Sequence, residues 1–317
     1  MKINRDGETD STGQAVGKIL ARIAEEKTLR HTELVELSNV LPADMPMFKI
    51  EWLKVPVDRR REVATRLVEM AEDNAELTFY PLFRVLLKDD DAEVRESAIE
   101  GLWEDDATSL IATFTRMMEQ DPSEDVQAAA AAALGKYALL AEIGKLRDVY
   151  NQTLSKSLLA IVNNPKKPLV VRRRALESVS AFSQPGIDEV IKAAYVSGDH
   201  DYKMSALFAM GRHCDTAFMP ILTAELSSPD SETRYEAASA LGEMGEEEAV
   251  SHLVELLDDT DADVQMTAIR SLGEIGGAQA KKILQKCLES PSEAIAEMAQ
   301  DALDELSAGE DPLDFKF

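Results

Sequence analysis

The stretch VQMTAIRSLG, residues 264–273, defines a register that recurs through most of this chain. When Val264 is numbered position zero, Ala268 falls at +4, Leu272 at +8 and Gly273 at +9. Apolar residues at this spacing lie along one stripe of an α-helix. Six further segments fit the register, and their zero positions are Val94, Val126, Val171, Tyr202, Thr233 and Ile295. Seven copies in one register predict a repeat protein.

The copies are evenly spaced in the C-terminal half of the sequence. Successive zero positions from Val171 to Ile295 are 31 residues apart, and Val94 and Val126 are 32 apart. The step from Val126 to Val171 is 45 residues, which predicts an insertion near residues 139–152 that forms extra helix or a loop. A weaker copy, DRRREVATRLVEM, precedes the others around residues 60–68.

Each copy is preceded by a second apolar stripe and a turn, as in AVSHLVELL (residues 249–257) followed by DDTDAD (258–263). Asp, Ser and Pro in such turns stop one helix and cap the next. Small Ala at +4 allows close helix packing, and Gly at +9 is expected to end the second helix, where a positive φ is common. Each repeat is therefore predicted to be two antiparallel helices, which must stack on neighbours to bury their apolar faces.

The pattern D-x-x-V-R-x-x-A-x-x-A-L-G, seen in DAEVRESAIEGL (residues 91–102) and SETRYEAASALG (231–242), resembles the HEAT repeat. The 31-residue step is similar to that of the phycobilisome-lyase-type subclass of this repeat. The resemblance covers roughly residues 50–306. It implies an all-α, ARM-repeat-like, right-handed α-solenoid of about seven to eight helix pairs.

Four regions are expected from this pattern. Residues 1–13 are predicted to be a disordered N-terminus, 14–48 N-terminal capping helices, 49–306 the solenoid and 307–317 a flexible acidic C-terminal tail. The last residues, DPLDFKF (311–317), are either an ordinary disordered end or a short docking motif that is similar to sliding-clamp peptides.

The composition restricts the kind of partner. With 34 basic and 59 acidic residues the net charge is −25, so the surface repels nucleic-acid phosphates and anionic lipids at long range. Only Cys214 and Cys287 are cysteines, and no apolar run or secretory signal is present in the sequence, so a cytoplasmic location is expected. A partner should be a protein or peptide that is basic or docks through apolar contacts.

No metal, cofactor or catalytic residue is expected. The acidic turns lack the spacing and glycine of a calcium loop and read as helix caps. None of the four histidines is followed by Glu, unlike the iron ligands of the HEAT-repeat hydroxylases that act on hypusine precursors. The glycines follow helix ends, whereas a phosphate loop precedes a helix.

The basic residues have two interpretations. Clusters lie at residues 59–61, 166–167 and 172–174, and position +1 of the repeat carries Arg95, Arg172, Lys203 and Arg234. In the HEAT family that position pairs with turn aspartates of neighbouring repeats, which is the favoured interpretation. The alternative is a DNA-binding groove, which the net charge disfavours.

The resemblance implies that the second helices line a concave surface. At about 100° per residue, positions +2, +5, +6 and +9 point away from the helix-pair core. The predicted partner-binding residues at these positions are Met204, Leu207, Phe208, Tyr235, Met266, Ile269, Arg270, Arg173 and Leu176. The +2 side chains are expected to be exposed, whereas the +5 side chains either face a partner or pack between neighbouring second helices. Trp103 either plugs a junction between repeats or forms a contact site.

The predicted function is a non-catalytic scaffold or adaptor that holds a partner segment in the concave groove. Two alternatives stay open. Repeat subtype alone implies a bilin lyase or its accessory subunit, and the relation of some HEAT-like proteins to DNA glycosylases implies a DNA-lesion binder.

Overall fold

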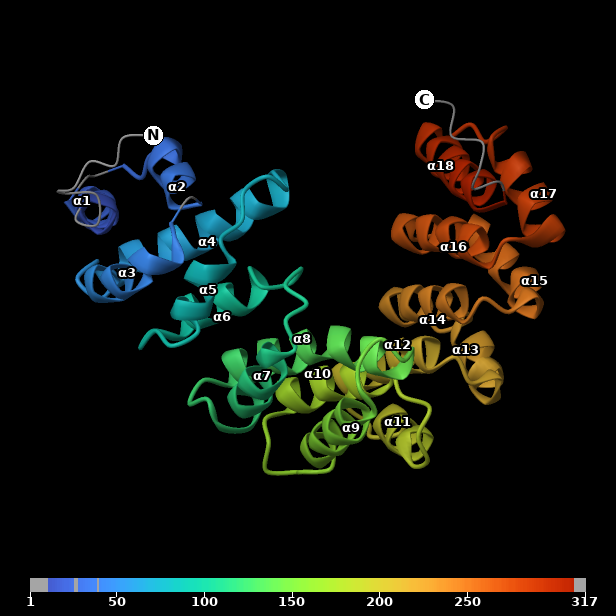
Figure 1. Cartoon of the computed structure of the whole chain (residues 1–317). Coiled ribbons are helices and arrows are strands. Elements are labelled where there is room, and N and C mark those ends of the chain that lie inside the picture. The colour runs from blue at the N-terminus through green and yellow to red at the C-terminus, as the bar shows by residue number, and fades with distance from the viewer. Residues whose placement is uncertain (1–10, 26–27, 39, 311–317) are drawn as a thin grey trace. The chain divides into compact units, whose positions relative to one another are not determined.

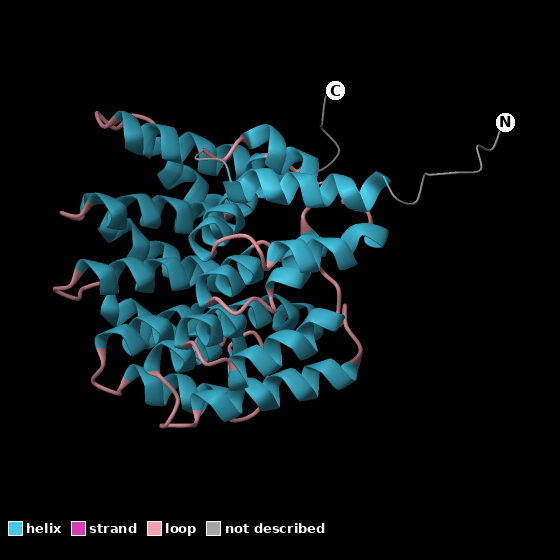
Figure 2. Cartoon of the chain, turned by 90° about the vertical axis from the view of Figure 1, so that its left-hand side faces the viewer, coloured by secondary structure: helices cyan, strands magenta, loops and turns pink. Residues whose placement is uncertain are grey.

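The computed structural model describes residues 11–25, 28–38 and 40–310. All regular secondary structure in these residues is helical, with loops between the helices (Figure 2). The chain divides into two compact units, residues 1–134 and 135–317, and the boundary falls inside helix α8. None of the described helices combines the length and apolar composition needed to cross a bilayer.

The first unit contains two groups of packed helices. Its elements are α1 (Ser11–Glu25), α2 (His31–Leu37), the 3₁₀ turn η1 (Pro42–Asp44), α3 (Met45–Trp52), α4 (Val57–Asp73), α5 (Tyr80–Leu86), α6 (Ala92–Glu100), α7 (Ser109–Gln120) and the start of α8 (Glu124–Glu142). Helix α1 packs on α3, and α4 packs on α6 with α5 beside it. The aromatic side chains of Phe48, Trp52, Phe79 and Phe83 are fully buried between these helices.

The second unit is a succession of helix pairs. Its elements are α9 (Asp148–Val162), α10 (Leu169–Val179), α11 (Ile187–Tyr195), α12 (His200–His213), η2 (Thr216–Phe218), α13 (Met219–Glu225), α14 (Ser231–Met244), η3 (Glu247–Ala249), α15 (Val250–Leu253), η4 (Val254–Asp258), α16 (Ala262–Ile275), α17 (Gly277–Cys287) and α18 (Glu293–Glu310). The second helices of the pairs, α10, α12, α14, α16 and α18, pack on one another in that order. Figure 1 shows α13, α15 and α17 on one side of this row. Within this unit the predicted all-α stacking of helix pairs is confirmed.

The side chains at positions 0, +4 and +8 of the repeat form the core of each helix pair. Val264, Ala268 and Leu272 on α16 have no exposed surface, and the corresponding positions of α10, α12 and α14 are likewise buried. On α18, Ala299 and Leu303 are buried and Ile295 is partly exposed. Burial of this stripe against the paired first helix and the neighbouring second helices holds each repeat in place.

The glycines at +9 do not end the second helices, which corrects the expectation. Helices α12, α14 and α16 continue past Gly211, Gly242 and Gly273, and the positive φ occurs three residues later. The residues with positive φ are Cys214 (52°), Gly245 (72°) and Gly276 (68°). The +9 glycines instead allow close approach of the next second helix, because a Cβ on Gly211 would lie 2.6 Å from the Ala240 Cα and one on Gly273 would lie 2.9 Å from the Ala302 Cβ.

The predicted region boundaries shift by a few residues. Helix α1 begins at Ser11 rather than at residue 14, and α18 continues to Glu310, so residues 307–310 are helical rather than part of a flexible tail. The insertion near residues 139–152 extends α8 and the start of α9 around a short loop. Residues 1–10 and the segment DPLDFKF lie outside the described residues, and the handedness and number of the repeats stay predictions.

Candidate interaction surface

The acidic turns hold the starts of the second helices. In the two best-matched repeats an aspartate lies five residues before position zero, and Oδ1 of Asp89 and of Asp259 each accepts a hydrogen bond of 2.9 Å from the amide two residues later. Asp91 and Asp261 then cap the amides of the zero-position valines at 3.2 and 3.3 Å. The turn carboxylates are thus helix caps, as predicted.

In the same two repeats, the side chain at +1 donates a hydrogen bond to a backbone carbonyl of the turn that precedes its own helix. Arg95 donates to the carbonyl oxygen of Asp89 at 2.9 Å, and Gln265 donates to that of Asp259 at 2.7 Å. Arg95 and Arg234 also form bidentate ion pairs with the turn of the following repeat. Arg95 bonds Asp121 at 2.7 and 2.9 Å, and Arg234 makes two hydrogen bonds of 2.7 Å to Asp259. The predicted ion-pair ladder is confirmed for these two arginines.

The other two basic +1 residues have different partners. Lys203 pairs with Glu225 on α13 at 2.9 Å, a helix carboxylate rather than a turn aspartate. Arg172 donates to the Val162 carbonyl at 3.0 Å, and its guanidinium lies 5.1 Å from the centroid of the Tyr202 ring. All four basic +1 residues are therefore engaged inside the protein.

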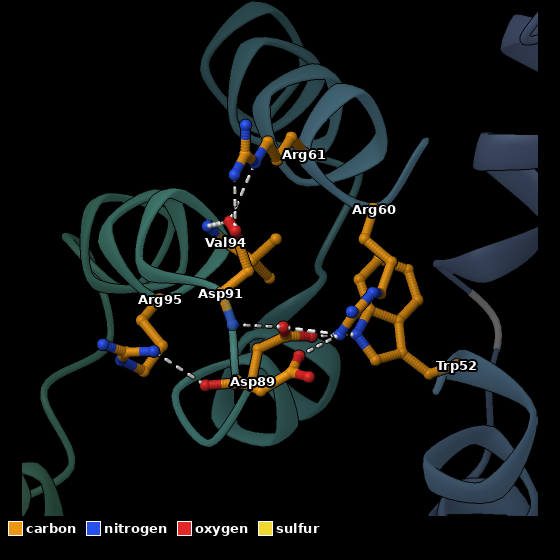
Figure 3. Close-up of polar contacts among 8 residues, drawn as sticks. Trp52, Arg60, Arg61, Asp89, Asp91, Val94 and Arg95 are labelled. Carbon is orange, nitrogen blue, oxygen red and sulfur yellow. Dashed lines mark hydrogen bonds and ion pairs between the residues drawn. The ribbon is translucent and has the colours of Figure 1, made fainter. Parts of the chain in front are cut away.

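Asp89 is the centre of a larger network in the first unit (Figure 3). Its carboxylate accepts hydrogen bonds of 2.6 Å from the Trp52 indole and from Arg60, and it has no exposed surface. Arg60 also bonds Asp90 at 2.7 Å, and this hydrogen bond lowers the pKa of the Asp90 carboxyl. Arg61 pairs with Asp91 and lowers its pKa in the same way. This network accounts for two of the three arginines at residues 59–61.

The structure buries four of the predicted partner-binding residues. Leu176, Leu207 and Ile269 at +5 have no exposed surface, and Met204 at +2 is 4% exposed. The +5 side chains pack between second helices, which was one of the two alternatives, and the expected exposure of Met204 is wrong. The close helix approach at the +9 glycines explains this burial, and the Met204 sulfur lies 4.0 Å from the Thr233 hydroxyl of the next second helix.

The remaining predicted residues are accessible on the second helices of the second unit. Phe208, Tyr235 and Met266 are partly exposed, on α12, α14 and α16 respectively. Arg270 is 45% exposed and lies 3.7 Å from Glu274, one turn along α16. Arg173 on α10 pairs with Asp201 at 2.7 Å and donates to the Ser205 hydroxyl at 3.0 Å. We call the accessible surface of α10, α12, α14 and α16 around these five residues the second-helix face.

Three glutamates on this face were missed from the sequence. Burial is the main cause of a raised pKa for each of the Glu236, Glu243 and Glu274 carboxyls. Neighbouring carboxylates add to it, Glu177 and Glu232 for Glu236, and Glu305 for Glu274. A signal was present in the sequence, because glutamate recurs at +10 in Glu243, Glu274 and Glu305.

An open hollow of about 630 Å³ lies where two of these glutamates meet Arg270. Its lining includes Ser239 and the +9 glycine Gly242 from α14, with Glu243, Glu274 and Arg270 at its sides. A hollow with both charge signs and a small-residue floor can accept a polar or basic side chain.

Trp103 is placed differently from the prediction of a plug. Its side chain is 69% exposed, three residues after the end of α6, so it does not fill a junction between repeats. The contact interpretation stays open.

His200, His213 and both cysteines belong to helices of the second unit or to their ends. His200 is paired with Glu232 at 2.9 Å, which raises its pKa, and His213 Nδ1 lies 3.1 Å from the Ser180 carbonyl. Burial raises the pKa of both the Cys214 and Cys287 thiols. No group of three His, Cys, Asp or Glu in the described part of the chain is placed to hold a metal ion.

Comparisons with known proteins identify the repeat. A family model of HEAT repeats matches residues 80–155 and 219–304. No curated protein matches the chain. An engineered protein of known structure is 23% identical over 63% of this chain and 97% of its own, with a TM-score of 0.38.

Two natural proteins of known structure are also similar. The Escherichia coli protein YibA is 16% identical over 97% of this chain and 99% of its own, with a TM-score of 0.43. Human deoxyhypusine hydroxylase, solved in complex with glycerol, is 20% identical over 93% and 97%, with a TM-score of 0.30. Similarity at this level carries no conclusion about the function of this chain.

Proposed function

Since the chain belongs to the HEAT-repeat family, we propose that it is a non-catalytic scaffold that binds a segment of a partner protein on the second-helix face. HEAT-type stacks expose a continuous row of second helices, and such rows are extended binding surfaces. The 31-residue step favours the phycobilisome-lyase-type subclass as the finer assignment of the repeat.

The apolar part of the surface supports a protein partner. Phe208, Tyr235 and Met266 are partly exposed on three successive second helices. Aromatic and Met side chains are enriched at the centres of protein interfaces, where they supply area with little loss of side-chain freedom.

The half-buried carboxylates are the observation that carries the proposal. Glu236, Glu243 and Glu274 each have a raised pKa because burial and neighbouring acids destabilise the charged form. Arg270 and Arg212 offset only part of this unfavourable energy. A basic side chain that docks beside these carboxylates would stabilise them, so the partner segment combines basic and apolar residues.

The alternatives have less support. A DNA-binding groove would need free basic residues, whereas Arg95, Lys203 and Arg234 are paired with carboxylates. No specific feature of the described residues favours a bilin lyase.

The proposal is tested by capture of partners with matched variants. The double variant Tyr235→Asp, Met266→Asp places charges in the apolar row, and Glu243→Gln, Glu274→Gln removes two carboxylates. Both should lose the same captured proteins, and higher salt should weaken capture by the wild type. Val196→Asp is the control, because Val196 is 74% exposed and lies outside the second helices. Circular dichroism verifies that each variant is folded. Retention of every partner by both folded variants would contradict the proposal.

A further inference from the structure

A small cavity in the first unit has a lining unlike that of the second-helix face. Its volume is about 130 Å³, and it lies between the end of α4, the start of α5 and the residues after α6. Cavities that hold drug-sized ligands are typically about 300–1,000 Å³, so this one is sized for a single side chain.

Two aromatic rings form part of the wall. Trp103 is 69% exposed, and Tyr80 is partly buried at the first residue of α5. The Tyr80 hydroxyl lies 3.4 Å from Glu104, and burial followed by this carboxylate raises the tyrosine pKa. The Tyr80 hydroxyl is the donor in this hydrogen bond.

The position of Trp103 follows from the early end of α6. Helix α6 stops at Glu100, and Gly101 carries the fully buried Phe83 ring against its backbone, where a Cβ would collide with the ring. The chain leaves the helix there, and Trp103 at +9 lies outside it, whereas the +9 glycines of α12, α14 and α16 lie inside their helices.

The charge of the lining is one-sided. Glu72, Glu100 and Glu104 contribute carboxylates, and no Lys, Arg or His is among the described residues that line the cavity. Arg84, on the same helix as Tyr80, is directed to Asp105, with Nε 3.1 Å from Oδ2. The lining of the cavity thus combines aromatic side chains with three carboxylates.

We infer that this cavity binds the side chain of an arginine presented by a partner protein. The guanidinium would stack on the exposed Trp103 ring and donate to the surrounding carboxylates. Arg is favoured over Lys because its planar group stacks on aromatic rings and donates in several directions at once. The site lies in the first unit and is independent of the second-helix face, so either can fail without the other.

The two tryptophans allow a direct test on the full chain. Trp52 and Trp103 are the only tryptophans, so ¹⁵N-tryptophan labelling gives one indole N–H signal for each, and Trp103→Phe assigns them. Titration with N-acetyl-arginine amide to high millimolar concentration should shift the Trp103 signal saturably. The Trp52 signal should stay in place, because that indole is buried and bonded to Asp89. N-acetyl-citrulline amide, which has nearly the same shape without the charge, should have no effect.

Variants then separate this site from general attraction to an acidic protein. Glu72→Gln combined with Glu104→Gln should weaken arginine binding about three- to tenfold, and added salt should weaken binding by the wild type. Glu76→Gln is the matched control, because Glu76 is an exposed carboxylate on the same loop that does not line the cavity. An unmoved Trp103 signal, an equal shift with citrulline, or an equal loss in Glu76→Gln would overturn the inference.

Discussion

The repeats that contain α6 and α16 begin alike and end differently. At the start, Asp89 and Asp259 occupy the same repeat position, and each accepts a hydrogen bond from the amide two residues later. Each also accepts a hydrogen bond from an arginine of the preceding second helix, Arg60 for Asp89 and Arg234 for Asp259. This agreement across two units shows that the turn geometry fixes the register of the repeat.

The ends of these repeats follow different paths. Helix α16 continues to Ile275, with Gly273 packed against Ala302, whereas α6 stops at Glu100 and leaves Trp103 exposed. Where the next helix packs closely, only glycine fits at +9. Where the helix ends early, as α6 does, position +9 has room for a large side chain that is accessible to a partner.

The largest expected effect is at the shared turn. Asp89→Ala should destabilise the first unit by about 3 kcal/mol, because it leaves Arg60 largely buried without its main partner and removes the acceptor of Trp52. Asp259→Ala should cost about 2 kcal/mol, since Arg234 keeps its hydrogen bond to the Ser228 carbonyl.

Urea unfolding separates the two variants. Tryptophan fluorescence follows the first unit, which holds both tryptophans, and circular dichroism follows the whole chain. Asp90→Ala is the control, because Asp90 also pairs with Arg60 but is 78% exposed, and its removal should cost much less than that of Asp89. Equal shifts for Asp89→Ala and Asp90→Ala would show that burial of the carboxylate is unimportant.

The second expected effect is at position +9. Gly211→Ala should destabilise the second unit by about 2 kcal/mol, because the added Cβ would meet the Ala240 backbone and this strain exceeds the gain in helix propensity. Trp103→Ala should change stability by less than about 0.5 kcal/mol, since most of the side chain is in water. Chemical denaturation measures both, and a large loss for Trp103→Ala would remove the contrast between the two repeat ends.

The smallest expected effect is at +10, where Glu243 lies on α14 and Glu104 lies beyond the end of α6. Burial raises the folded-state pKa of Glu243 above its unfolded value, so the folded chain holds that proton more tightly. The free energy of unfolding therefore falls as pH rises through the raised pKa. Glu243→Gln should be slightly more stable than the wild type at pH 7, by less than about 0.5 kcal/mol because solvent screens a side chain that is 40% exposed. The difference should vanish below the unfolded pKa.

Denaturation at several pH values tests this sign. Glu104→Gln is the control, because Glu104 occupies the same repeat position but lies beyond the end of α6, and it should show no comparable pH-dependent gain. A Glu243→Gln variant that is less stable at pH 7 would mean that the attraction to Arg212 outweighs the cost of partly burying the Glu243 charge.

Much of the fold was predictable because the repeat depends on residues that are close together in the sequence. The stripe at 0, +4 and +8, the turn aspartates and the pairing of Arg95 and Arg234 all follow from one register. The candidate surface was less predictable. A helical wheel treats one helix alone, so it cannot distinguish a side chain facing solvent from one facing the next second helix, and Leu207 and Ile269 were buried by that second contact.

The raised pKa of the glutamates and the exposure of Trp103 also depend on contacts between helices, which the sequence of one helix does not reveal. The recurrence at +10 is visible in the sequence, but a raised pKa depends on burial and on acids that are distant in sequence. The exposure of Trp103 depends on α6 ending early, and the Phe83 ring against Gly101 becomes apparent only when the helices are assembled.

The links from Arg95 and Arg234 to the turns that follow them also make the order of these repeats chemically specific. Arg95 is followed by Asp121 and Arg234 by Asp259, whereas Gln265 is followed by Ser290 at the equivalent turn position. Exchanging the repeat of Gln265 with that of Arg234 would separate Arg234 from Asp259 and place it before Ser290, and the new junction would lack an ion pair. A shuffled or lengthened array must therefore carry Arg95 together with Asp121 and Arg234 together with Asp259.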